Sequence, residues 1–276
     1  MFKRWGLVLG VAAAACLAAA WLLPAISPGQ AQASTLSGKL VLAGSTSVQP
    51  LAEALAEEFM AKNPGVRVQV QGGGSSAGIS AAKSGAADIG TSSRELKPDE
   101  KGLHEVKVAL DGIAVVVHPK NSVKNLTSEQ ICKIYTGEIT NWKQVGGKDA
   151  PIMVVTREAG SGTRGAFEEL VMQKRSIFTK AIVQGSTGAV RSTVAQAPNS
   201  IGYISLGSLD ETVKAVSVNG VAASEENVKN KTYKIARPFL FLTRSQPAGL
   251  AKAFIDFALG KDGQKIVAEE FVPVSR

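Results

Sequence analysis

The stretch Thr156-Arg157-Glu158-Ala159-Gly160-Ser161-Gly162-Thr163-Arg164-Gly165 lies where an apolar run, residues 152–155, gives way to a helical pattern of apolar residues. It therefore predicts a strand-to-helix turn. Its glycines permit close backbone approach, its hydroxyls can donate hydrogen bonds, and the first N–H groups of the helix point outward. Arg157 adds a permanent positive charge. Such a turn suits an anion, although an ordinary capped turn with a solvated arginine has the same composition.

Three other junctions share this composition of glycine, serine and threonine: residues 44–47, 72–78 and 90–94. They follow predicted strands at 39–43, 66–70 and 87–90, and the first precedes a helix with Thr46 or Ser47 as its expected N-cap. In an open α/β sheet such junctions lie along the carboxyl ends of the strands, where ligands bind. A dehydrated oxyanion needs nearly every lone pair occupied. Four such junctions therefore predict a largely neutral cradle for a small oxyanion.

The rest of the chain alternates predicted strands and helices, which indicates an α/β protein. Helices are expected at 126–135, 184–196 and 248–271, and strands at 201–204 and 213–218. Two long β-prone runs stand out, residues 106–119 and 235–243, and Asp111-Gly112 interrupts the first. Each run is long enough to cross from one lobe of a protein to another.

Residues 1–33 read as an export signal, because Lys3 and Arg4 precede an apolar stretch and a small-residue cleavage site ends at Ala33. An uncleaved membrane anchor and lipidation at Cys16 are the alternatives. Cleavage would remove two positive charges and lower the net charge from +8 to +6. We therefore expect an exported protein in the periplasm or at the outer face of the cytoplasmic membrane.

Composition excludes several classes of function. With 276 residues, 45% hydrophobic and 20% charged, the chain can bury a large core. The basic residues are scattered singly, so nucleic-acid binding is not expected. After cleavage Cys132 is the only cysteine, which excludes an intramolecular disulfide and a cysteine-based metal site. We predict neither a metal nor a cofactor.

An enzyme is the main alternative from another class. Ser76 stands in Gly74-Ser75-Ser76-Ala77-Gly78, the Gly-x-Ser-x-Gly pattern of a serine hydrolase. Such a serine needs a histidine base, and only His104 and His118 exist, one in a polar stretch and one before a proline. The glycine-rich turns also lack the spacing of nucleotide-binding loops. We therefore predict no catalytic residue.

Taken together, these motifs make the chain resemble the PstS-like family of phosphate-binding proteins, which serve bacterial phosphate ABC transporters. The matching stretches are residues 44–51, 73–78, 88–94, 111–117, 139–142 and 157–163, with helical matches at 254–257 and 263–267. They extend over essentially residues 38–274. Each motif is weak by itself, and the set is specific.

The resemblance implies an α/β, two-lobed type II periplasmic-binding-protein fold with a hinge of two crossing strands. Residues 34–117 and 236–276 would form a discontinuous first lobe, and residues 118–235 the second. The lobes would close on the anion like a hinged clamp. Inorganic phosphate and the permease subunits of the transporter would be the partners of a monomer, and another tetrahedral oxyanion such as sulfate or molybdate is the alternative ligand.

The resemblance also implies the site residues. Phosphate would be bound by Thr46, Ser47, Ser75 and Ser93 from the first lobe and by Arg157, Ser161, Gly162 and Thr163 from the second. One branch of the family has an aspartate in place of Ser93 that accepts the proton of phosphate. We hypothesise that Asp111 takes this role here, with Asp88 as the rival. The alternative is that Asp111 shapes a turn or pairs with Arg94.

Overall fold

The structure is a computed structural model that describes residues 36–173 and 175–274. The predicted export signal, including Cys16 and Ala33, lies outside the described residues. Within the described ranges, none of the helices combines the length and the apolar character needed to cross a bilayer.

A mixed ten-stranded sheet runs through the described chain, with its main strands in the order β2-β1-β3-β11-β4-β8-β6-β7. The pairs β1–β2 and β1–β3 are parallel, the central strands β3, β11, β4 and β8 pair antiparallel, and β6 is parallel to β8 and β7. The strands are β1 (Ser37–Gly44), β2 (Gly65–Gly72), β3 (Ile89–Ser92), β4 (His104–Val117), β6 (Met153–Arg157), β7 (Ile182–Gln184), β8 (Ser200–Ser205) and β11 (Ala236–Thr243). Short strands β9 (Lys214–Ala215) and β12 (Val272–Pro273) pair with β4, and β5 (Asn125–Leu126) pairs with β10 (Ser217–Val218).

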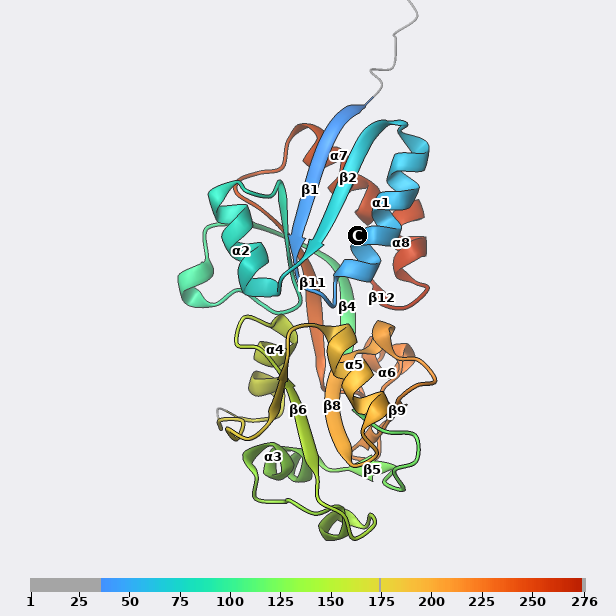
Figure 1. The fold of residues 1–276 in the computed structure, drawn as a ribbon. Coiled ribbons are helices and arrows are strands. Elements are labelled where there is room, and N and C mark those ends of the chain that lie inside the picture. The colour runs from blue at the N-terminus through green and yellow to red at the C-terminus, as the bar shows by residue number, and fades with distance from the viewer. Residues whose placement is uncertain (1–35, 174, 275–276) are drawn as a thin grey trace, which may run out of the picture. The chain divides into compact units, whose positions relative to one another are not determined.

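Helices follow most of the parallel strands, as the alternation in the sequence predicts. They are α1 (Gln49–Lys62), α2 (Ser75–Ser84), α3 (Ser128–Thr136), α4 (Gly162–Leu170), α5 (Thr187–Gln196), α6 (Glu225–Lys229), α7 (Gly249–Leu259) and α8 (Lys261–Val267). Helix α1 buries Leu51, Leu55 and Phe59 on one face, and it lies beside α8 (Figure 1). Helix α2 packs instead against β1 and β3 and joins Ile79 to Leu240 and Leu242 in a separate small cluster.

The apolar core has two large parts, and the chain passes between them along β4 and β11. One part contains Val108 and Ala109 of β4 and Phe239 of β11. The other contains Ile113 of β4 and Ile235, directly before β11. Lobe boundaries at 117/118 and 235/236 stay a prediction, since one sheet connects both parts of the core.

Strand β4 runs without a break through Asp111 and Gly112, so the predicted interruption is wrong. Asp111 stays in the strand because it lies opposite Arg237 of β11, which neutralises its charge. Gly112 is needed for close packing rather than for a turn: a Cβ there would lie 2.9 Å from Cγ2 of Val228 in α6.

Candidate anion-binding site

Seven serine and threonine side chains from several strand ends and helix starts form two hydrogen-bonded groups, which we call together the hydroxyl cluster. The two groups are linked by the backbone N–H of Ser47, which donates to Oγ of Ser45 at 3.3 Å. The members of the cluster are Ser45, Thr46, Ser47, Ser75, Ser93, Thr163 and Thr187. All are buried except Thr46, which is half-buried. Buried hydroxyls require hydrogen-bond partners, and here most of the side-chain partners are one another.

One half of the cluster joins the β1–α1 junction to α4 and α5. The Ser47 Oγ lies 2.8 Å from Oγ1 of Thr163 and 2.8 Å from Oγ1 of Thr187. The backbone N–H of Thr187 donates to Oγ1 of Thr46 at 3.2 Å. Residues from opposite parts of the core therefore meet here through three hydroxyl groups and one backbone N–H group that bonds to a fourth.

The other half of the cluster joins three junctions near β1 and β3. The Ser45 hydroxyl donates to Oγ of Ser93 at 2.8 Å, and the Ser93 N–H donates to Oγ of Ser75 at 3.0 Å. Gly162 lies directly over this group: a Cβ at that position would stand 2.1 Å from Oγ of Ser75 and 2.6 Å from Oγ of Ser93. Glycine is thus required at 162 for the start of α4 to reach the serines.

Arg157 supplies the positive charge that borders the hydroxyl cluster. Its side chain is 2% exposed. Its Nε and Nη2 donate to the two carboxylate oxygens of Glu158, both at 2.9 Å, and its Nη1 donates to Oγ1 of Thr187 at 3.2 Å. A guanidinium has five N–H donors, so one N–H on each Nη nitrogen has no hydrogen bond within the described residues. These two donors are therefore available to an anion.

The start of α4 adds backbone donors to the site. Ser161 is the N-cap, and its Oγ accepts from the N–H of Arg164 at 3.2 Å. The first N–H groups of a helix have no intrahelical partner and carry partial positive charge. Beside this helix the Ser76 N–H donates to the carbonyl of Gly160 at 3.1 Å. This contact brings the starts of α2 and α4 together.

One local prediction about this region was wrong, and another was incomplete. The expected N-cap of α1 was Thr46 or Ser47, but Val48 holds that position and no side chain caps the helix. The hydroxyls of Thr46 and Ser47 bond to Thr187 and Thr163 instead. Sequence reasoning also missed Thr187, because the helix predicted at 184–196 enclosed it. The signal was present: Gly185-Ser186-Thr187-Gly188 is a further glycine and hydroxyl junction after a strand.

The structure does not join Asp111 to the hydroxyl cluster. Its Oδ2 accepts from Nε and Nη2 of Arg237 at 3.0 and 2.8 Å. Its Oδ1 accepts from the Ser205 hydroxyl at 2.8 Å and from the Leu206 N–H at 3.1 Å. All four lone-pair directions of the carboxylate are thus occupied. The predicted role of Asp111 as acceptor of a phosphate proton remains a hypothesis, and these contacts speak against it.

The other acidic and basic candidates lie in separate networks. Asp88 is exposed and accepts from the Val41 N–H at 2.8 Å. Arg94 pairs with Glu100 at 2.6 Å rather than with Asp111, so that alternative was wrong. The hydroxyl of Ser76 accepts from Nη2 of Arg94 at 3.2 Å. Within residues 36–173 and 175–274 no hydrogen bond joins Ser76 to a histidine, so nothing supports a serine hydrolase.

No group of three or more metal-ligating side chains occurs in the described part of the chain. Cys132 is a buried free thiol, and burial raises its pKa.

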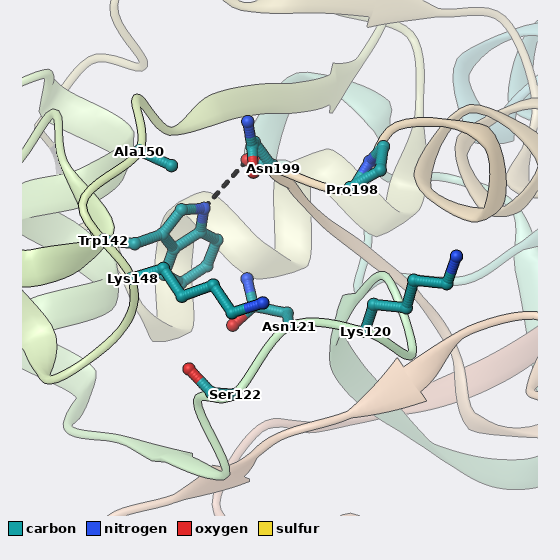
Figure 2. A pocket seen from close by; sticks show the side chains of 8 residues that line it. All are labelled: Lys120, Asn121, Ser122, Trp142, Lys148, Ala150, Pro198 and Asn199. Carbon is teal, nitrogen blue, oxygen red and sulfur yellow. Dashed lines mark hydrogen bonds between the residues drawn. The ribbon is translucent and has the colours of Figure 1, made fainter.

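A separate pocket of about 150 Å³ lies away from these residues (Figure 2). Its wall contains the edge of Trp142, whose Nε1 donates to the carbonyl of Asn199 at 2.9 Å. Lys120 and Lys148 are exposed and line this pocket, and none of the described residues that line it is acidic. Exposed lysines attract anions of any kind and are screened by salt. The pocket therefore calls for a control in any anion-binding measurement.

Comparison with known proteins shows the family to which the chain belongs. The family described as the PBP superfamily domain matches residues 29–262. The phosphate-binding protein PstS of Bacillus subtilis is 37% identical over 246 residues, which cover 87% of this chain and 82% of that protein. The chain belongs to the PBP superfamily and, within it, to the PstS phosphate-binding protein family. The predicted resemblance is confirmed.

Solved structures of this family agree in fold. A phosphate ABC transporter substrate-binding protein from Clostridium perfringens, with bound phosphate, is 47% identical and has a TM-score of 0.84, covering 86% of this chain and 100% of that one. An ABC-type phosphate transport receptor from Vibrio cholerae is 41% identical with a TM-score of 0.72, covering 86% and 100%. The predicted α/β periplasmic-binding-protein fold is confirmed. Family membership also confirms that the protein is a binding protein and not an enzyme.

Proposed function

We propose that this protein captures inorganic phosphate at the hydroxyl cluster and delivers it to an ABC importer. The observation that carries the proposal is the meeting of Ser47 with Thr163 and Thr187, beside the buried Arg157. Hydroxyls, free helix N–H groups and one arginine can occupy the lone pairs of a dehydrated tetrahedral anion. The relatives named for phosphate binding support the same ligand.

The ligand would replace many of the hydrogen bonds that the hydroxyls make with one another. Each hydroxyl can rotate and donate to an anion oxygen, and Arg157 would present its two unbonded N–H groups in a bidentate contact. The residues proposed to bind phosphate are Thr46, Ser47, Ser75, Ser93, Arg157, Ser161, Gly162, Thr163 and Thr187. Thr187 is the addition to the set expected from the sequence.

Capture would follow from closure of two lobes, residues 34–117 with 236–276 and residues 118–235, about β4 and β11. The contact between the Ser76 N–H and the Gly160 carbonyl would form on closure, because it joins the starts of α2 and α4 without involving the ligand. Hinged closure around a ligand is a common motion of such two-lobed proteins.

The wider assignment follows from the family and the first residues of the chain. We infer an exported monomer that works in the periplasm or at the outer face of the cytoplasmic membrane and hands phosphate to permease subunits. Mass spectrometry of the mature N-terminus would distinguish cleavage after Ala33 from a retained anchor or a lipid on Cys16.

Isothermal titration with phosphate, sulfate and molybdate tests the ligand. We expect one phosphate per chain and much weaker binding of the other two anions. The variant with Lys120→Ala and Lys148→Ala, titrated at low and high salt, serves as the control for unspecific binding. Tight sulfate or molybdate binding with weak phosphate binding would reassign the ligand, and heat that disappears in the lysine variant would refute the site.

Competition between phosphate and sulfate in Asp111→Asn tests the proton-acceptor hypothesis. An ionised carboxylate facing sulfate would leave two unpaired acceptors in a desolvated site, at a cost of about 1 to 3 kcal/mol or more. If Asp111 were that filter, the variant would lose its preference for phosphate. Asp88→Asn is the next variant to test.

A further inference from the structure

Asp111 and Arg237 form a buried ion pair between the two strands that connect the parts of the core. They lie opposite each other in the β4–β11 ladder, and their side chains are 0% and 1% exposed. The contact is two-pronged, from Nε and Nη2 of Arg237 to Oδ2 of Asp111. Such a pair fixes geometry, because either charge left alone in this place would be strongly unfavourable.

The second oxygen of Asp111 bonds to a different segment. Oδ1 accepts from the hydroxyl of Ser205, the last residue of β8, and from the N–H of Leu206. At this point β4 exchanges partners: Asp111 pairs with β11, and Ile113 pairs with Ser205. One carboxylate therefore holds β4, β11 and the end of β8 together.

Strand β8 connects Ser205, which bonds to Asp111, with the residues beside the anion site. Two residues before Ser205, the hydroxyl of Tyr203 lies 2.7 Å from Oγ1 of Thr156 and accepts from the Arg157 N–H at 3.3 Å. The Tyr203 ring stacks on Phe167 of α4 with centroids 4.1 Å apart, and Tyr203 is 1% exposed. Tyr203 is thus held on both its ring and its hydroxyl. Its contacts fix the end of β6, from which Arg157 projects.

Arg237 also interacts electrostatically with the anion site. Its burial lowers its pKa, Asp111 opposes that shift, and the positive charge of Arg157 lowers the pKa further. Its Nη1 is a buried side-chain nitrogen with no partner in the described chain. A second guanidinium near Arg157 would push that side chain away unless Asp111 balanced its charge.

We propose that the Asp111–Arg237 pair is a positioning pair for Arg157, acting through β8 and Tyr203, and that it sets phosphate affinity without touching the anion. The proposal rests on the proposed function. It differs from the proton-acceptor hypothesis in what it predicts for sulfate. A displaced Arg157 weakens phosphate and sulfate alike, whereas a lost filter strengthens sulfate alone.

The first experiment compares wild type with Asp111→Asn by calorimetric titration of phosphate and sulfate. If the wild-type protein does not bind phosphate, the proposed function is wrong. If the wild type binds phosphate and Asp111→Asn binds it equally well, only this inference is wrong. Residues that hold metal ligands in position are worth roughly 10- to 100-fold in metal affinity. By analogy, we expect Asp111→Asn to lose roughly tenfold in affinity for both phosphate and sulfate. Unchanged phosphate affinity, or a gain for sulfate, overturns the proposal.

A double-mutant cycle with Tyr203→Phe tests the route. Tyr203→Phe removes only the hydroxyl group. If both residues act on Arg157 through the same contacts, the losses of affinity in Tyr203→Phe and Asp111→Asn should not add. The double variant should then bind phosphate about as well as the weaker single variant. Fully additive losses overturn the route through Tyr203. Phe254→Leu, in the core beside α1, is the control for lowered stability: it should lower the melting temperature and leave affinity at the wild-type value.

A paired substitution keeps the proposal testable if Asp111→Asn does not fold. Asp111→Leu with Arg237→Met removes both charges at similar volume, and such replacements are often neutral or stabilising. The hydrogen bonds from Ser205 and Leu206 to the residue 111 side chain are still lost in this variant. We therefore expect a folded protein whose phosphate affinity is reduced roughly tenfold, as when residues that hold metal ligands in position are lost. Wild-type affinity in this folded variant overturns the proposal.

Discussion

The hydroxyl oxygens of Ser47 and Thr163 lie 2.8 Å apart although 116 positions separate these residues in the chain. Ser47 follows β1 and Thr163 lies in the first turn of α4. Two buried hydroxyls from different parts of the core satisfy each other, which is an arrangement that a polyatomic anion can replace with stronger, charge-assisted hydrogen bonds.

Phosphate should stabilise the folded protein by mass action, because the site exists only in the folded chain. At a phosphate concentration 100 times the dissociation constant, the gain is about 2.7 kcal/mol in the free energy of unfolding. Thermal unfolding at increasing phosphate measures it, with equal ionic strength from chloride as the control. A melting temperature unmoved by millimolar phosphate would contradict the proposed function.

Replacing Arg157 with lysine should weaken phosphate binding although the charge is kept. Lysine cannot bond to both oxygens of Glu158 and still present two parallel N–H groups to the anion. A lost charge-assisted hydrogen bond is worth about 1.5 to 3 kcal/mol, or roughly 10- to 150-fold in affinity. Calorimetry of Arg157→Lys measures the loss. Arg175→Lys, at an exposed arginine near Glu138, is the control and should bind as wild type does.

Thr187→Val should lower phosphate affinity while keeping the shape of the side chain. The substitution removes the oxygen that bonds to Ser47 and to Nη1 of Arg157. An unsatisfied buried donor costs about 1 to 3 kcal/mol. Thr193→Val on the same helix removes a hydroxyl that bonds to Gln184 and the Ala189 carbonyl. It should alter stability only, and equal affinity losses in both variants would contradict a binding role for Thr187.

Gly162→Ala should weaken phosphate binding by steric conflict. The added methyl would lie 2.1 Å from Oγ of Ser75, so α4 or the serine must move away. Overpacking of this kind costs about 1 to 3 kcal/mol, and we expect phosphate affinity to fall by at least tenfold. At Gly188 a Cβ would meet nothing within 4 Å. Gly188→Ala should therefore retain affinity, and a normal affinity in Gly162→Ala would refute the close approach.

Acid should destabilise the protein partly through Glu100. Its hydrogen bond with Arg94 holds the pKa of Glu100 below the ordinary value of 4.5. The folded state therefore favours the ionised form, so this contribution is present above pH 4.5 and is lost as the pH falls through the lower folded-state pKa. Urea unfolding at pH 7 and pH 4 should show a smaller difference in Glu100→Gln than in wild type. An equal difference would rule out this pair as a source of the acid sensitivity.

Much of the fold could be predicted from the sequence because it depends on local patterns. The spacing of Leu51, Leu55 and Phe59 predicts the buried face of α1, and the apolar runs predict β4 and β11. Glycines followed by serines and threonines mark most of the junctions that form the site. These features follow from periodicity and turn chemistry within a few residues, so no tertiary information is needed.

The partners of polar side chains were decided by tertiary structure alone. Asp111-Gly112 has the local character of a turn, yet Asp111 remains in a strand because Arg237, 126 positions away, lies opposite. Thr46 and Ser47 have the local character of helix caps, yet they bond across the site. Thr187 gained its role only because α5 begins beside Ser47. A polar side chain can satisfy its hydrogen bonds in several ways locally, and which of them is realised depends on what the fold buries beside it.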